Sequence, residues 1–453
     1  MSIINRCNFS FCSFGTVLHS SSMPLSGFLT IPSFAIGCIT AHAGDDRFGF
    51  ATHFEQGWPP TPLMQAIASS GVSYIRDDLN AGSWENSRGV YVRPSWDMGW
   101  LNAAKANGLK VVGILGPNWH YSDNYDPVAM FNLAAWIAKT GLVTAFEVTN
   151  EPNNAYASYE GPTWETKLVA LTNAVTAAVH AVNPSIQVIG LGGQGAQIFN
   201  MLALGTTMNG VVYHPYANGN YIPETTYEWQ YLDYGSWIQA LDSKTTLPKW
   251  ETEWGIGTTA KFTNANQAEF LGRRLLQEAG LGVEHSFIYE FADNGPELYG
   301  VDSNYPMTPK TAFYVVQRII SALAGVQGGT SFVTVNSVAN GDVADVKAFA
   351  YQGSINKTVV AFWFGNHDPR TPPAASTCQL TFTVPHPHWH SYVMNAMTGT
   401  QVPCRRTNVR RAEPNFLLLD CRYRINPRSS SCNDHLNTKT MSLFWRIRSA
   451  FAS

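Results

Sequence analysis

The feature that most constrains the fold of this chain is a repeated alternation between short apolar runs and longer amphipathic runs. Each short run is rich in β-branched and aromatic residues, as in KVVGILG at 110–116, which favours a buried β-strand. In the run that follows, the apolar residues recur at helical spacing. Eight such pairs lie along the chain. The expected strands are 48–54, 73–79, 110–116, 143–151, 186–192, 210–216, 248–254 and 285–291, and the expected helices are 61–70, 95–107, 127–139, 163–182, 197–203, 227–242, 265–280 and 309–324.

Eight strand-and-helix pairs predict an α/β fold, a closed (β/α)8 TIM barrel over residues 44–325. Parallel strands need crossover helices, and eight strands close around an interior that side chains fill. An open, doubly wound sheet is the alternative. In an open sheet the functional side chains gather near one switch point, whereas here polar residues recur at strand ends from His53 to Tyr289. This distribution favours the barrel.

The pattern changes after residue 325. Short alternating strands with Gly and Asn turns, such as KTVVAFWF at 357–364, predict a β-sandwich domain over residues 326–403. The basic tail, 404–453, is rich in Arg, Ser and Asn and fits neither domain, so the sequence assigns it no structure. It has ten Lys and Arg against three acids, while the rest of the chain has 19 against 29. An acidic body argues against nucleic acid as a partner.

Residues 1–43 resemble a leader segment. Arg6 is the only charged residue before Asp45, the second half is mostly apolar, and AHA at 41–43 matches a small-x-small cleavage site. We therefore expect export, so that the protein is secreted or periplasmic. Attachment of a lipid to Cys38 in the sequence AIGC is the alternative. No other stretch is apolar for long enough to form a transmembrane segment.

Cysteine use excludes two kinds of site from the barrel. The chain has seven Cys, and none lies between residues 39 and 377. A cysteine nucleophile or a cysteine-based metal site therefore cannot operate there. The four late cysteines allow three disulfide pairings in an exported protein. They are Cys378, Cys404, Cys421 and Cys432.

Two glutamates stand at the ends of expected strands. Glu151 precedes Pro152, which has no N–H to continue a ladder, so the strand is expected to stop at Glu151. Glu253 ends the seventh strand, just before Gly255. The fourth and seventh strands lie across the barrel mouth from each other. Because cleavage of a glycosidic bond needs two carboxyl groups on opposite sides of one sugar carbon, this pair suits that reaction.

A third glutamate, Glu251, lies two residues before Glu253. Side chains two apart share one face of a strand, so both are expected to point into the barrel. Glu251 would lie one layer deeper, and its expected role is a structural hydrogen bond.

Three motifs, in order along the chain, resemble the retaining glycoside hydrolases of clan A. They are NEP at 150–152, HPY at 214–216 and TEWG at 252–255. Asn153 and the stretch LVALTNAVTAAVHAVNPSIQVIGLG make the resemblance strongest to glycoside hydrolase family 39. The resemblance spans about residues 48–324. It implies a barrel with an appended β-sandwich that acts on carbohydrate and uses no cofactor.

The resemblance also implies roles for five residues. Glu151 would be the acid/base and Glu253 the nucleophile. Glu151 would then be protonated near neutral pH, and partial burial and the charge of Glu253 are expected to raise its pKa. Arg76, on the second strand, would hold the charge of Glu253, and Tyr216 would donate a hydrogen bond to it. Asn150 resembles the asparagine that donates to the sugar 2-hydroxyl.

Other residues at the strand ends are candidates for binding sugar. His214 is expected to line the subsite next to Glu151 rather than bind a metal, because no HxxxH motif or carboxylate cluster accompanies it. Clan A enzymes often present a tryptophan at the end of strand eight, where this chain has Tyr289, so the sugar preference cannot be carried over. Glu290, beside it, is expected to be structural. The candidates for stacking on sugar or binding its hydroxyls are Trp119, His120, Trp254 and Tyr289.

The predicted function is that of an exported retaining glycoside hydrolase acting on the β-bonds of a polysaccharide or oligosaccharide, of the β-glucan or xylan type. An endo-glucanase or xylanase and an exo-acting β-xylosidase are both open, because the shape of the cleft decides between them. A non-catalytic glycan-binding cell-surface protein and a transglycosylase with the same site are the alternatives. The presence of both Glu151 and Glu253 favours an enzyme.

Overall fold

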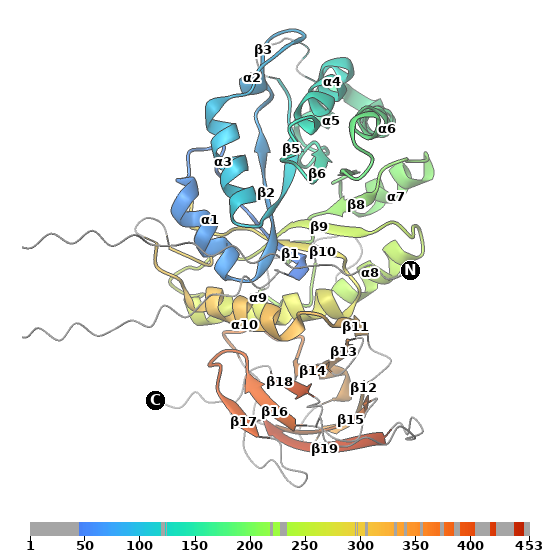
Figure 1. Ribbon diagram of the computed structural model, residues 1–453. Helices are drawn as coiled ribbons and strands as arrows, with labels where there is room; N and C mark the ends of the chain where they lie inside the picture. The colour runs from blue at the N-terminus through green and yellow to red at the C-terminus, as the bar shows by residue number, and fades with distance from the viewer. Residues whose placement is uncertain are drawn as a thin grey trace, which may run out of the picture. The chain divides into compact units, whose positions relative to one another are not determined.

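The computed structural model describes most of the chain from residue 45 onward (Figure 1). The predicted leader with Cys38, and the candidates Trp119 and His120, lie outside the described residues. Among the described residues no helix combines the length and the apolar character needed to cross a membrane. The described residues are 45–118, 123, 125–217, 221–226, 233–294, 296, 298–303, 307–329, 333–338, 342–353, 357–371, 376–384, 390–403, 417–422 and 439–447.

Eight parallel strands close into a barrel, which confirms the predicted α/β barrel fold. Around the ring their order is β1-β10-β9-β8-β7-β6-β5-β2, and the small antiparallel pair β3 and β4 lies outside it. The barrel strands are β1 (Asp45–Ala51), β2 (Val72–Leu79), β5 (Lys110–Leu115), β6 (Ala145–Val148), β7 (Gln187–Gly190), β8 (Gly210–Tyr213), β9 (Lys249–Trp254) and β10 (His285–Ile288); β3 is Glu85–Ser87 and β4 is Val90–Tyr91.

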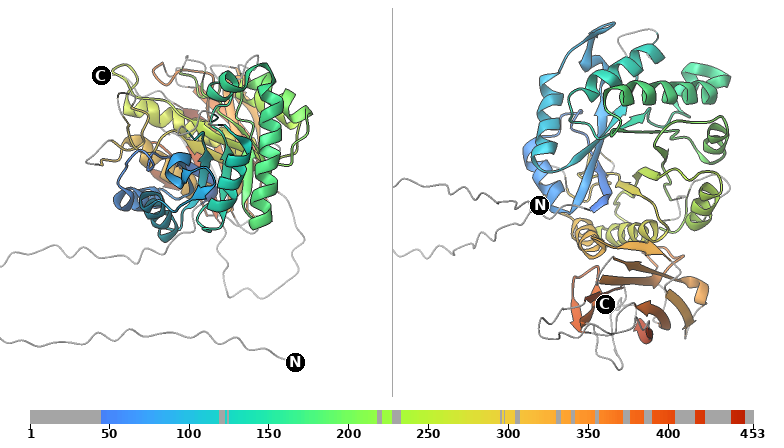
Figure 2. Two further views of the ribbon diagram at one scale, coloured as in Figure 1. Left: turned by 90° about the horizontal axis from the view of Figure 1, so that it is seen from above. Right: turned by 45° about the vertical axis from the view of Figure 1, so that its right-hand side comes forward.

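Helices surround the barrel wall (Figure 2). Eight of them match the expected helices, and α2 and α5 are short additions in the connections. They are α1 (Pro60–Ser69), α2 (Ala81–Trp84), α3 (Ser95–Ala106), α4 (Pro127–Ala138), α5 (Ala155–Glu160), α6 (Trp164–Val182), α7 (Gly195–Ala203), α8 (Tyr234–Asp242), α9 (Asn264–Gly280) and α10 (Thr311–Leu323).

The strand that leads to Glu151 ends earlier than expected. β6 ends at Val148, and the chain leaves strand geometry at Thr149, which has a φ of 63°. Glu151 itself has a φ of 40°. The sequence predicted that Pro152 stops the strand at Glu151. That prediction is wrong, because the strand ends three residues earlier. Non-glycine residues seldom adopt positive φ, and such residues gather at functional sites, where surrounding contacts hold the strained backbone.

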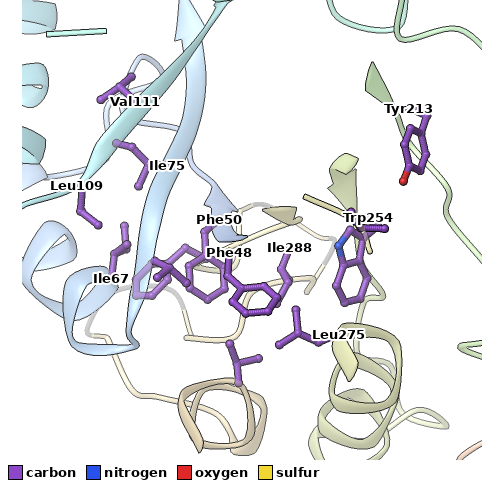
Figure 3. Packing of buried hydrophobic residues seen from close by; sticks show 14 of the residues in the cluster. Phe48, Phe50, Ile67, Ile75, Leu109, Val111, Tyr213, Trp254, Leu275 and Ile288 are labelled. Carbon is purple, nitrogen blue, oxygen red and sulfur yellow. The ribbon is translucent and has the colours of Figure 1, made fainter. Parts of the chain in front are cut away.

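The described residues form two hydrophobic clusters in and around the barrel. Inside the barrel, toward the N-terminal ends of the strands, buried rings such as Tyr74, Trp250 and Phe287 close the lumen. Gly49 makes room for them, since a Cβ there would lie 2.5 Å from the Phe287 ring. The larger cluster lies between the strands and the helices and includes Trp254 (Figure 3). The site at the other end of the strands therefore rests on a closed, aromatic floor.

Gly255, just after β9, allows a close approach between two chain segments at the barrel mouth. A Cβ at this position would lie 1.9 Å from the carbonyl oxygen of Tyr289. Because backbone cannot rotate away as a side chain can, Gly255→Ala is expected to lower the free energy of unfolding by about 3 kcal/mol. Gly116→Ala, where nothing lies within 4 Å of the added Cβ, should change it by about 0.5 kcal/mol or less. Urea unfolding measures both, and equal losses would contradict the close approach.

After α10 the chain forms two antiparallel sheets. Their orders are β11-β13-β14-β18-β16-β17 and β12-β15-β19. The last two strands come from the basic tail, where β18 pairs with β14 and β19 with β15. The sequence left this tail without an assigned structure, and two of its segments pair with strands of these sheets. Face-to-face packing of the sheets as a β-sandwich stays a prediction. The strands are β11 (Gln327–Gly329), β12 (Val333–Val338), β13 (Val346–Gln352), β14 (Lys357–Phe364), β15 (Ser376–Val384), β16 (His390–Asn395), β17 (Gln401–Pro403), β18 (Leu417–Arg422) and β19 (Lys439–Ile447).

Candidate active site

A bulge in β9 decides which way its two glutamates point. Ser286 of β10 pairs with Glu251 of β9, and Ile288 pairs with Trp254. Between these two pairs the chain advances two residues in β10 but three in β9. The extra residue in β9 breaks the regular alternation of side chains. Glu253 faces the barrel mouth, while Glu251 faces the helices outside. The expectation that both acids point inward is therefore wrong.

Glu251 and Trp254 belong to the packing between β9 and the helices. Glu251 is fully buried and accepts hydrogen bonds from the Tyr234 hydroxyl and from Arg274, the latter at 3.1 Å. The indole N–H of Trp254 donates to the Ser286 hydroxyl at 2.8 Å, and the ring is 1% exposed. Trp254 is thus a core residue and not the sugar-stacking group that the sequence had suggested, because the bulge turns it outward.

Two donors hold the carboxylate of Glu253 from opposite sides. Arg76 Nη1 donates to Oε2 at 3.0 Å, and the Tyr216 hydroxyl donates to Oε1 at 2.7 Å. The Glu253 side chain is 14% exposed. Its carboxylate is therefore oriented by the protein and still open to a ligand.

Arg76 has a second carboxylate partner that the sequence analysis missed. It donates to both oxygens of Glu147 on β6, at 2.7 and 2.8 Å. Burial by itself would raise the pKa of Glu147, but the Arg76 guanidinium overcomes it and lowers that pKa to about 2. The sequence does contain a signal for this ion pair. A charged residue inside the apolar run AFEV needs a buried partner of opposite charge.

Asn150 follows β6 at the edge of the mouth. Its side-chain oxygen accepts a hydrogen bond of 2.6 Å from Arg76 Nη2, and the residue is exposed. Since Arg76 occupies the oxygen, the amide NH2 is the group that Asn150 can offer to a sugar hydroxyl.

His214 joins Glu151 to the rest of the site. Its Nδ1 lies 3.3 Å from Glu151 Oε1, and its Nε2 lies 3.1 Å from Thr252 Oγ1. Burial lowers the pKa of the imidazole, but the carboxylates of Glu253, Glu147 and Glu151 raise it to about 9. His214 is therefore an imidazolium at neutral pH.

The imidazolium changes the expected behaviour of Glu151. The hydrogen bond from His214 is the main cause that lowers the pKa of Glu151, and partial burial acts in the opposite direction by raising that pKa. Asn154 donates to the other oxygen at 2.9 Å. The sequence predicted a raised pKa because it did not show that a cation would lie beside this carboxylate.

Glu151, His214 and Glu253 form a compact group. One carboxylate oxygen of each glutamate and a ring nitrogen of His214 all lie within 4.8 Å of one another. His214 therefore does have carboxylates around it in the folded protein, contrary to the expectation from the sequence. The donor types would suit a cation, yet a metal needs a neutral imidazole. Arg76, 3.0 Å from Glu253, also places a positive charge beside the gap, so the group fits an uncharged ligand better than a divalent ion.

Aromatic rings continue from Tyr216 along one side of the mouth. The ring of Tyr299 lies 6.5 Å from that of Tyr216 and 5.6 Å from that of Tyr289. Tyr289 is half-buried and meets His53 edge-to-face at 5.6 Å. His53 Nε2 lies 2.9 Å from a carboxylate oxygen of Glu290, which is 1% exposed. Tyr289 therefore belongs to an aromatic row that leads to Glu253, and Glu290 serves as the partner of His53.

The raised pKa of His214 gives a testable dependence of stability on pH. Its pKa in the folded protein, about 9, lies above the ordinary value of 6.5. The stability it contributes is therefore fully present below pH 6.5 and is lost as the pH rises through 9, an effect on the order of 3 kcal/mol. Urea unfolding at both ends of this window should show that loss in the wild type and little of it in His214→Gln. Parallel curves for the two proteins would contradict the assignment.

Comparisons with known proteins agree with the barrel. No family model matches the sequence, and no curated protein does. A structure of a family 39 glycoside hydrolase from the gut symbiont Bacteroides cellulosilyticus WH2 matches with a TM-score of 0.62 and 19% identity, covering 83% of this chain and 80% of that one. The GH39 enzyme from Xanthomonas axonopodis pv. citri matches at 0.57 and 15%, covering 84% and 96%.

A xylanase of glycoside hydrolase family 30, subfamily 8, from Clostridium acetobutylicum also matches, at a TM-score of 0.52 and 14% identity, covering 83% of this chain and 96% of that one. At sequence identities this low, the structural similarity shows that the fold is shared and shows nothing more. The chain therefore shares the barrel fold of family 39 and family 30 glycoside hydrolases, as its sequence motifs indicate.

Proposed function

We propose that the protein is a retaining β-glycoside hydrolase in which Glu253 is the nucleophile and Glu151 the acid/base. The observation that carries the proposal is the short gap between the two side chains, whose facing oxygens lie within 4.8 Å. Retaining enzymes hold their two carboxyl groups about 5 to 5.5 Å apart, whereas inverting enzymes leave about 6.5 to 9.5 Å for a water molecule. The gap here accommodates one anomeric carbon and favours double displacement.

In the first step, an oxygen of Glu253 attacks the anomeric carbon. The bond from that carbon to the leaving oxygen breaks, and the leaving oxygen takes a proton from Glu151. Arg76 and Tyr216 hold Glu253 in line for the attack (3.0 and 2.7 Å). In the second step, water attacks the same carbon and gives its proton to Glu151, which releases Glu253 and restores both acids.

The pair of Glu151 and His214 supplies the proton that the first step needs. At rest the pair holds one proton between them, on the imidazole side, because the pKa of His214 is raised and that of Glu151 is lowered. A bound sugar that displaces water from Glu151 disfavours its charged form and draws the proton across the 3.3 Å contact. Glu151 is then a protonated acid only when substrate is present.

The charge around the mouth favours an uncharged sugar over a uronic acid. Asp78, two residues after Arg76, lies within electrostatic range of Arg76 and Glu253. Besides the cations Arg76 and His214, the carboxylates of Glu147, Glu151, Glu253 and Asp78 gather around the site, so a sugar carboxylate would be repelled. This supports glucosides and xylosides as substrates.

Proton NMR of the reaction mixture tests the proposal. Aryl β-glucoside, aryl β-xyloside, soluble β-glucan and xylan are each incubated with the wild type and with Glu253→Gln. We expect the first-formed sugar to have the β-configuration, before mutarotation, and Glu253→Gln to form none. An α-product would mean inversion and would overturn the double displacement. Binding without turnover would favour the glycan-binding alternative, and longer oligosaccharides at high sugar concentration would favour the transglycosylase.

A further inference from the structure

Arg274, on α9, touches both chain segments that carry the Glu253 machinery, although it lies outside the barrel. Its side chain is 2% exposed, and its five N–H groups make five hydrogen bonds. The acceptors are the backbone oxygens of Pro215 (2.9 Å), Pro223 (2.9 Å) and Thr225 (3.1 Å), and the carboxylates of Glu251 (3.1 Å) and Glu278 (2.7 Å). Every donor of the guanidinium is used.

The bond to Pro215 fixes a short segment that carries two site residues. Pro215 lies between His214 and Tyr216, and the N–H of Tyr216 donates to the carbonyl of His214 at 2.9 Å. Proline has no N–H of its own, so its carbonyl is the backbone group that can anchor the segment from outside. Arg274 Nη2 provides that anchor at 2.9 Å. The position of the Tyr216 hydroxyl therefore depends on Arg274.

The same Nη2 atom also holds the strand that carries the nucleophile. It donates to Glu251, two residues before Glu253 and next to the bulge in β9. The Tyr234 ring lies 3.4 Å from the guanidinium carbon and fixes its plane. One rigid group thus sets the spacing between the donor segment and the acceptor strand. A flexible ammonium has three donors and cannot make this set of contacts.

We propose that Arg274 is a positioning residue that sets the hydrogen bond between Tyr216 and Glu253 and so keeps the nucleophile in its attacking orientation. The proposal rests on the proposed glycosidase function for its kinetic consequence. Its geometric content, the place of the Tyr216 hydroxyl, is independent of that function.

The test compares Arg274→Lys with Arg273→Lys. Arg273 is the next residue on α9, equally buried, and it forms a two-bond ion pair with Glu224 that does not touch Pro215. Displacing a catalytic group by about 1 Å can cost on the order of 10²-fold in rate. We expect Arg274→Lys to lower kcat by that order with little change in KM, and Arg273→Lys to change kcat by about twofold or less. Equal effects would assign the loss to broken buried ion pairs and overturn the proposal.

A double-mutant cycle shows whether Arg274 acts through Tyr216. In the Tyr216→Phe background the further loss from Arg274→Lys should shrink to about threefold or less, because the bond it positions is already gone. A full additional loss would overturn the proposal. If Arg274→Lys does not fold, Arg274→Gln combined with Glu251→Gln removes both charges of one pair together and is carried through the same cycle.

A crystal structure of the folded Arg274 variant separates this proposal from the proposed function. We expect the Tyr216 hydroxyl to move out of hydrogen-bond distance of Glu253, whatever the enzyme hydrolyses. An unchanged contact would overturn the positioning role even in an active enzyme. A displaced hydroxyl in a protein whose wild type turns over no glycoside would keep the positioning role and reject the glycosidase function.

Discussion

Replacing Glu253 by glycine is expected to abolish hydrolysis, with a loss in kcat on the order of 10⁵-fold, the scale seen when a nucleophile is removed. Arg76 and Tyr216 hold its carboxylate so that one oxygen lies within 4.8 Å of an oxygen of Glu151. Steady-state hydrolysis of an aryl β-glycoside measures the loss.

Rescue by azide turns this loss into a test of stereochemistry. Glycine leaves a space where the carboxylate was, and the Arg76 guanidinium attracts an anion to it. Azide in that space can attack the anomeric carbon while Glu151 protonates the leaving oxygen. The product then is an α-glycosyl azide, since one displacement inverts the centre.

The control is Glu284→Gln, which changes an acid just before β10, at the end of the barrel far from the mouth. This variant should keep its kcat and gain nothing from azide. A Glu253→Gly protein that hydrolyses substrate without azide, or one that yields a β-azide, would remove Glu253 from the nucleophilic role.

The barrel could be predicted because each of its eight units carries a complete local signal. A run such as KVVGILG has β-branched residues for a fully buried strand, and the helix after it has its own spacing and its own start. Asp126 caps α4 by accepting from the Val128 N–H, with Pro127 at the first helical position. Such signals do not depend on distant residues, so a single sequence is enough to place them.

The misjudged residues are those whose environment depends on a distant part of the chain. The bulge in β9 appears only in its register with β10, and it puts Glu251 and Glu253 on opposite faces although regular alternation would place them on the same one. The pKa of Glu151 is lowered by His214, which is 63 residues away in sequence. The burial of the Glu147 carboxylate is explained only by its ion pair with Arg76, which is 71 residues away in sequence.

The two glutamates at the mouth were easier to predict than their neighbours for a physical reason. Strand ends in a parallel barrel open on one face, so an acid there is placed by topology alone. Arg76, within β2, and Tyr216, three residues beyond β8, could be added only through their resemblance to residues of family 39. Contacts from outside the barrel, such as those of Arg274, have no counterpart in the strand pattern and come only from the packing of α9.

Replacing Glu151 by alanine is expected to affect substrates according to their leaving groups. A 2,4-dinitrophenyl glycoside departs without a proton, so the first step should slow by less than about tenfold. An unactivated oligosaccharide needs the proton and should lose on the order of 10² to 10⁴-fold in kcat/KM. A uniform loss across leaving groups would contradict the acid role.

The pH dependence of the same step distinguishes the acid from a merely nearby carboxylate. Below the raised pKa of His214, about 9, the His214–Glu151 pair holds the one proton that the first step transfers, and above it the pair is empty. Wild-type kcat/KM on an oligosaccharide should therefore fall as the pH rises through 9. In His214→Asn the proton must stay on Glu151, whose pKa is lower, so the fall should move to lower pH. In Glu151→Ala the fall should vanish, because the residual rate no longer uses that proton, and its persistence there would assign the alkaline fall to another group.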